Sequence, residues 1–119
     1  GFLQQMVFNH EELSERLDGD EELLGEVLAA FLVDLPEITH DLKLALDAGD
    51  MESIRLAAHK IKGAAASVNF MQLSALAKQI EFAARDQDSD RIEHFSRFLD
   101  QLSRDALVAA GQRAAKNQG

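Results

Sequence analysis

The sequence has no cysteine, tryptophan or tyrosine, and its seven aromatic residues are all phenylalanine. The absence of cysteine excludes disulfides and thiolate metal sites and is compatible with a reducing cytoplasm. No apolar run approaches the roughly 20 residues of a membrane span, and no signal-peptide pattern is present. The chain begins with Gly1 rather than Met, so we expect it to be part of a longer protein.

Positive charge is also scarce, because 12 Lys and Arg stand against 21 Asp and Glu and leave a net charge of −9. Such a domain should repel nucleic-acid phosphates and anionic lipid, so we expect no nucleic-acid partner and no direct membrane contact. The acidic surface serves solubility, or it steers the domain toward a partner with a basic rim.

A length of 119 residues predicts one domain with one modest core. Apolar residues recur at helical spacing, and neither strand-like alternation nor an internal repeat is present. We therefore predict an all-α fold, an up-and-down antiparallel four-helix bundle with a short N-terminal capping helix. Its core is expected over residues 7–111, and the polar tail over 112–119 is expected to fray.

Short polar residues that can cap helix N-termini divide the chain. The predicted caps are Asn9 for a helix to 17, Asp20 for a helix to about 46, Asp50 for a helix to about 68, and Asp90 for a helix to about 110. A further helix is expected over 71–85, after Asn69 as a left-handed stop. Pro36 lies within the second helix, but the apolar stripe keeps its phase there, which predicts one kinked, continuous helix.

One histidine lies opposite the predicted core. His59 falls about 150° from the centre of the apolar stripe of its helix when successive residues are placed about 100° apart, so it should point at water. Lys62 and Gly63 follow it at i+3 and i+4 on the outer face. A neutral imidazole is nucleophilic near physiological pH, and residues with small side chains beside it leave room for another protein. The stripe consists of Ile54, Ala57, Ala58, Ile61, Ala65 and Val68.

The segment from His59 to Val68, HKIKGAAASV, resembles the signature of histidine-containing phosphotransfer (HPt) domains. The flanking residues over roughly 7–98 are also similar to the family. The string is most similar to the C-terminal modules of bacterial tripartite hybrid sensor histidine kinases. Two departures are Asn69, where the family usually has glycine, and Ala64 with Ala65 in place of small hydroxyl residues.

The resemblance implies a role for each residue of the site. His59 would carry a phosphoryl group on Nε2, Lys62 would lie beside it, and Gly63 would leave room for a docking receiver domain. Glu81, 22 positions after His59, would hydrogen-bond the other ring nitrogen. The expected docking surface is the His59 face with Leu13, Leu17, Ala66 and Lys78.

The expected function is that of a phosphoryl carrier in a two-component multistep phosphorelay, and not of an enzyme. His59 would receive the group from one receiver aspartate and pass it to another. The sequence has no phosphate-binding glycine-rich loop, so we expect no cofactor here and Mg²⁺ in the partner receiver domain. We expect a monomer in the cytoplasm, either free or within a membrane-anchored sensor kinase.

Two other classes of function compete with this interpretation. Glu37 and His40 have the Glu-x-x-His spacing of di-iron bundles, but those sites need a second copy, and none is present. A passive helical adaptor is compatible with the amphipathic helices, although it does not require an outward histidine beside lysine and glycine. The sequence also leaves open whether Phe82 packs on the last helix or contributes to a partner surface.

Overall fold

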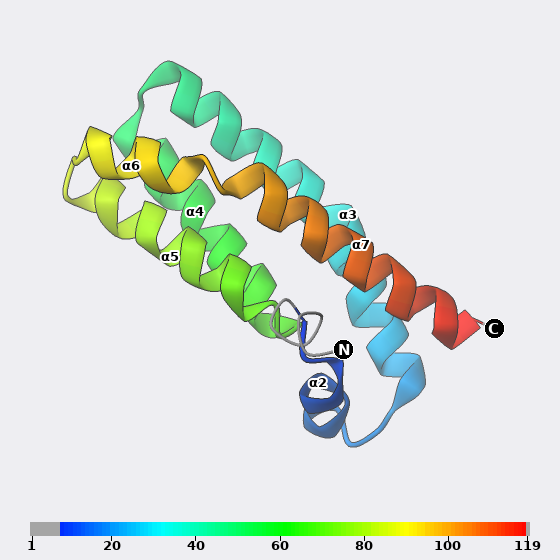
Figure 1. Cartoon of the computed structure of the whole chain (residues 1–119). Coiled ribbons are helices and arrows are strands. Elements are labelled where there is room, and N and C mark those ends of the chain that lie inside the picture. Colours follow the sequence, from blue (N-terminus) through cyan, green and yellow to red (C-terminus); the bar gives the residue numbers. More distant parts are fainter. Residues whose placement is uncertain (1–7, 119) are drawn as a thin grey trace.

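The computed structural model describes residues 8–118, and these form helices with no strand among them (Figure 1). The predicted all-α class is confirmed. Val7, where the core was expected to begin, and Gly119 lie outside the described residues. The helices are α2 (His10–Arg16), α3 (Glu21–Ala48), α4 (Met51–Ser67), α5 (Met71–Arg85), α6 (Ser89–Ser96) and α7 (Leu99–Gln118).

Short connections make successive long helices antiparallel neighbours, as the bundle prediction requires (Figure 1). Helix α4 packs mainly against α5 and α3, and α7 packs mainly against α3. Helices α6 and α7 together form the fourth element of the bundle. The short α2 lies at the end where α4 gives way to α5, so it covers one end as expected.

Three of the four predicted N-caps are confirmed by hydrogen bonds. The side chain of Asn9 accepts from the Glu12 N–H at 3.0 Å, and Asp20 accepts from the Leu23 N–H at 3.0 Å. Asp50 accepts from the Ser53 N–H at 3.3 Å. These bonds satisfy backbone donors that have no partner within their own helix.

Helix α3 continues through Pro36, which confirms the prediction of one continuous helix. Proline removes a backbone donor and crowds the preceding turn. The Thr39 hydroxyl donates to the carbonyls of Leu35 at 2.9 Å and Pro36 at 3.0 Å. Leu35 remains fully buried, so the core-facing side of α3 is kept through the proline.

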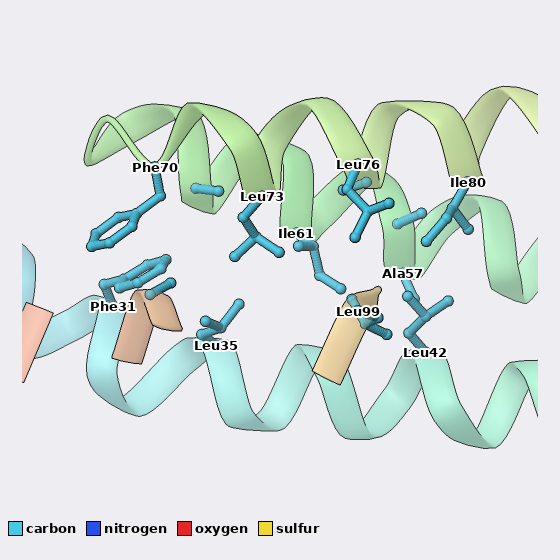
Figure 2. Close-up of a cluster of buried hydrophobic side chains, with 14 of the residues drawn as sticks. Phe31, Leu35, Leu42, Ala57, Ile61, Phe70, Leu73, Leu76, Ile80 and Leu99 are labelled. Atoms are coloured by element: carbon cyan, nitrogen blue, oxygen red, sulfur yellow. The ribbon is translucent and has the colours of Figure 1, made fainter. Parts of the chain in front are cut away.

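The core is one cluster that runs along the bundle between the helices (Figure 2). At one end the rings of Phe31 and Phe70 stack with centroids 4.9 Å apart, and Phe8 stacks on Phe70 at 4.4 Å. Between α4 and α5 the buried residues are mostly small or branched aliphatic, which brings these two helices close together. They include Ala57, Ala58, Ile61 and Ala65 of α4 and Leu73, Ala77, Ile80 and Ala84 of α5.

The last predicted helix is wrong in two respects. Asp88, not Asp90, is the N-cap of α6, and it accepts from the Arg91 N–H at 3.1 Å. The chain then turns at Arg97 and Phe98 before α7 begins. The turn takes the chain from α6, which packs on α5, to α7, which packs mainly on α3. The inward residues keep three- and four-residue spacing across the turn, so periodicity does not reveal it.

The tail that was expected to fray is helical over its described residues, because α7 continues to Gln118. Arg113 pairs with Glu21 at the start of α3, with nitrogen and oxygen 2.9 Å apart. Ala114 packs against the core. These contacts with α3 hold a segment whose polar composition alone suggests a loose end.

Candidate functional site

His59 lies on the outer face of α4, and 59% of its side chain is exposed. The predicted apolar face of the same helix is buried, since Ile54, Ala57, Ala58, Ile61 and Ala65 all lie in the core. The ring therefore stands in solvent on a helix whose opposite side is packed against α3 and α5.

Glu81 reaches His59 from α5, as the resemblance implied. Its Oε2 lies 3.0 Å from Nδ1 of His59, although only 12% of the Glu81 side chain is exposed. Glu81 sits at the edge of the buried face of α5, between core residues and solvent. A nearly buried carboxylate thus contacts one nitrogen of an exposed imidazole.

This contact determines which ring nitrogen is free. Burial by itself raises the pKa of Glu81, but hydrogen bonds from Lys62 and His59 more than compensate, and the pKa lies below its ordinary value of 4.5. Glu81 is therefore ionised near neutral pH and can only accept hydrogen bonds. Because Nδ1 must then carry the proton, the neutral ring has its lone pair on Nε2.

Lys62 lies one turn beyond His59, and its ammonium is paired with Glu81, Nζ to Oε1 2.7 Å. Oε1 is buried, and the ammonium of Lys62 compensates its charge at this short distance. The resemblance placed Lys62 beside a phosphoryl group. In the structure its ammonium compensates the charge of the carboxylate that contacts the ring.

Gly63 is exposed and lies inside α4, where a glycine is not needed for the backbone conformation. A Cβ placed on Gly63 would have no atom within 4 Å outside its own stretch of helix. No packing inside the described structure therefore requires a glycine, and the space that it leaves lies on the same face as His59.

The predicted docking residues fall in different environments. Leu13 is wrong as a docking residue, because it is 1% exposed and packs in the core. Leu17 is half-buried and packs against the core, and Ala66 is half-buried with its carbonyl 3.5 Å from Arg16 Nη1. Lys78 is exposed on α5.

The side chain of Phe82 is half-buried on α5 between two cations. Lys78 Nζ lies 5.5 Å from the ring centroid, and the Arg85 guanidinium carbon lies 4.6 Å from it. The ring therefore contacts cations on its own helix, which answers part of what the sequence left open.

Two residues near the site were not predicted. Arg55 precedes His59 by four residues, hydrogen-bonds Glu52 at 3.0 Å and interacts electrostatically with Glu81. Ser74 of α5 donates to the Lys62 carbonyl at 3.0 Å. The i−4 spacing of Arg55 is a signal that the sequence does contain. Ser74 gives none, because the contact depends on how α4 and α5 align.

Residues 8–118 contain no group of three or more His, Asp or Glu placed to hold a metal ion. The Glu37 and His40 side chains are exposed on α3, so the di-iron alternative has no support. Within the described residues, no helix combines the length and apolar character needed to cross a bilayer.

Comparison with known proteins gives one family. A family model described as the Hpt domain matches residues 26–105, which include α4, α5 and all of the residues around His59. No curated protein and no solved structure matches the chain.

Proposed function

The chain belongs to the Hpt domain family, and from this premise we propose that His59 accepts a phosphoryl group from a receiver-domain aspartate and passes it to a second receiver aspartate. Hpt domains carry out histidine phosphotransfer in phosphorelays, interact with receiver domains, and are carriers rather than enzymes. The observation that supports His59 as the carrier is its 3.0 Å contact with Glu81, which occupies Nδ1 and leaves Nε2 available on a side chain that is 59% exposed.

The transfer needs no proton to leave the imidazole. The Nε2 lone pair attacks phosphorus, the bond from phosphorus to the aspartyl oxygen breaks, and the aspartate leaves as a carboxylate. Nδ1 keeps its hydrogen and its bond to Glu81, whose negative charge stabilises the positive charge that develops on the ring. In the second transfer an aspartate attacks phosphorus, the N–P bond breaks, and His59 regains its lone pair.

Lys62 has a supporting role in this proposal. Its pairing with Glu81 reduces the cost of keeping a carboxylate 12% exposed beside the ring. We assign the Mg²⁺ that phosphoryl transfer ordinarily uses to the receiver domain. The absence of cysteine supports a cytoplasmic setting, and we propose that the domain acts there as a monomer, as a module of a sensor histidine kinase.

The test is phosphorylation of the chain by phosphorylated receiver domains. We expect acid-labile, base-stable label on the unchanged protein and none on His59→Gln, which removes only an exposed ring and should keep the fold. His40→Gln is the matched control, because His40 is exposed on α3. Label that survives in His59→Gln would refute the assignment.

A further inference from the structure

Ser74 is a buried polar residue in an interface made mostly of aliphatic side chains. It is 6% exposed, and its hydroxyl donates to the carbonyl of Lys62 across the α4–α5 boundary at 3.0 Å. A hydroxyl removed from water costs free energy unless it is hydrogen-bonded. The bond explains why a serine is tolerated at this buried position. It also fixes Ser74 of α5 against Lys62 of α4.

Three polar contacts join α4 to α5 in the part of the chain that the structure describes, and they form a continuous series. The Ser74 hydroxyl binds the Lys62 carbonyl at 3.0 Å, and the Lys62 ammonium pairs with Glu81 at 2.7 Å. The other oxygen of Glu81 lies 3.0 Å from Nδ1 of His59. Lys62 is thus held at its main chain by one residue of α5 and at its side chain by another.

The spacing of these residues suits antiparallel helices. Ser74 and Glu81 are seven residues apart, so they lie on one face of α5 about 10 Å apart along its axis. Helical side chains lean toward the N-terminus of their helix, which directs the Lys62 ammonium toward the turn that carries His59. The contacts with Ser74 and Glu81 therefore occur together only at one axial alignment of α4 and α5.

The remainder of this interface consists largely of methyl and methylene groups, including those of Ala58, Ala65, Ala77 and Ala84. Dispersion contacts between such groups have no directional preference, whereas a hydrogen bond weakens steeply with distance and angle. The Ser74 bond is for this reason the contact near Lys62 that is most sensitive to a small axial shift.

We propose that Ser74 is a positioning residue for the His59 site, acting through Lys62 and Glu81. The expected effect of Ser74 on the transfer rate rests on the proposed function. The expected effect of Ser74 on the tautomer of the His59 ring does not depend on that proposal. If Ser74 is lost, Lys62 shifts, Glu81 loses part of its charge compensation, and its bond to Nδ1 weakens. The ring then populates the tautomer with hydrogen on Nε2, which cannot attack phosphorus.

The experiment compares Ser74→Ala with two further variants. Ser74→Thr keeps a hydroxyl at the same position. Ser103→Ala is the matched control, since Ser103 is a buried helical serine, 7% exposed, whose hydroxyl has no hydrogen-bond partner among the described residues. The thermal unfolding curve of each variant is measured first, and the experiments are then carried out at a temperature at which all variants are folded.

Two measurements are made on each protein. Nitrogen-15 chemical shifts of the His59 ring, recorded without any phosphodonor, report the fraction of the Nδ1–H tautomer. The rate of phosphoryl transfer from a phosphorylated receiver reports function. For Ser74→Ala we expect a clear rise in the Nε2–H tautomer and a transfer rate reduced by roughly 3- to 10-fold. We expect recovery in Ser74→Thr and no change in Ser103→Ala.

A Ser74→Ala protein with the unchanged tautomer fraction would overturn the inference, and so would a Ser74→Thr protein as impaired as Ser74→Ala. A change of equal size in Ser103→Ala would show that loss of any buried hydroxyl suffices, which also overturns it. Failure of the unchanged protein to accept phosphate from a receiver would instead contradict the proposed function, and the tautomer measurement would still decide the role of Ser74.

Discussion

Substitutions of Gly63 should affect the stability of the free domain and phosphoryl transfer from a receiver domain in different ways. Glycine inside an exposed helix is about 1 kcal/mol less favourable than alanine. A Cβ on Gly63 meets no atom within 4 Å, so Gly63→Ala should gain nearly all of that difference. For a chain of 119 residues this corresponds to a rise of about 3–6 °C in Tm.

A larger side chain at the same position should have the opposite effect on transfer. Residues four apart on a helix are neighbours, about 5–6 Å between Cβ atoms. Long helical side chains lean over the preceding turn, so leucine at position 63 should lie across the approach to His59. We expect Gly63→Leu to be at least as stable as the unchanged protein and to lose roughly 10-fold or more in transfer from a receiver domain, about 1.4 kcal/mol.

The assay pairs two phosphodonors. A phosphorylated receiver needs a broad surface around His59, whereas phosphoramidate is a small molecule that needs only the ring. Gly63→Leu should therefore lose much more of its receiver-dependent labelling than of its phosphoramidate labelling, and Gly63→Ala should keep both. Equal receiver-dependent rates for the alanine and leucine variants would refute the idea that Gly63 provides space for a docking domain.

Two further predictions concern buried polar groups. The pKa of Glu81 lies below its ordinary value of 4.5, so the unfolded state binds the proton more readily than the folded state does. Ionised Glu81 therefore stabilises the fold at pH values above 4.5, and this stabilisation is lost as the pH falls below that value. Urea denaturation from about pH 6 to pH 3 should show a steeper loss of unfolding free energy on acidification for the unchanged protein than for Glu81→Gln, and parallel profiles would contradict this. Asn69 is 4% exposed, accepts from Arg16 at 2.8 Å and donates to the Asn9 carbonyl at 3.4 Å. Asn69→Gly keeps the turn but loses these bonds, so we expect a loss of about 1–2 kcal/mol and faster amide exchange in α2, and unchanged exchange there would count against a clamping role.

Much of the fold could be predicted because it depends on local chemistry. Asn9, Asp20 and Asp50 cap helices through bonds to residues three positions away, and a cap is visible in any sequence that contains it. Asn69 adopts a φ of +65°, as expected of a left-handed stop. The break between α6 and α7 could not be predicted in this way, because it depends on which helices the two segments pack against.

The resemblance, and not periodicity, identified Glu81, since a charged residue at the edge of a buried face is ordinarily a solvated one. Its pairing with Lys62 was missed because the two residues come from different helices, and their contact depends on an alignment that no single helix specifies. The burial of Leu13 could not be predicted for a similar reason. Whether its side chain is exposed or buried depends on where α2 packs against the other helices. In the structure α2 is fixed by Arg16 and Asn69, and Leu13 is thereby placed in the core.

The positive charge of Lys62 affects how Glu81 can orient the His59 ring. A carboxylate paired only with an imidazole would favour a protonated ring, which has no lone pair to attack phosphorus. Lys62 supplies a permanent positive charge 2.7 Å from Glu81, so the carboxylate is already compensated when the ring is neutral. Glu81 can then orient Nδ1–H without requiring a second proton on the ring.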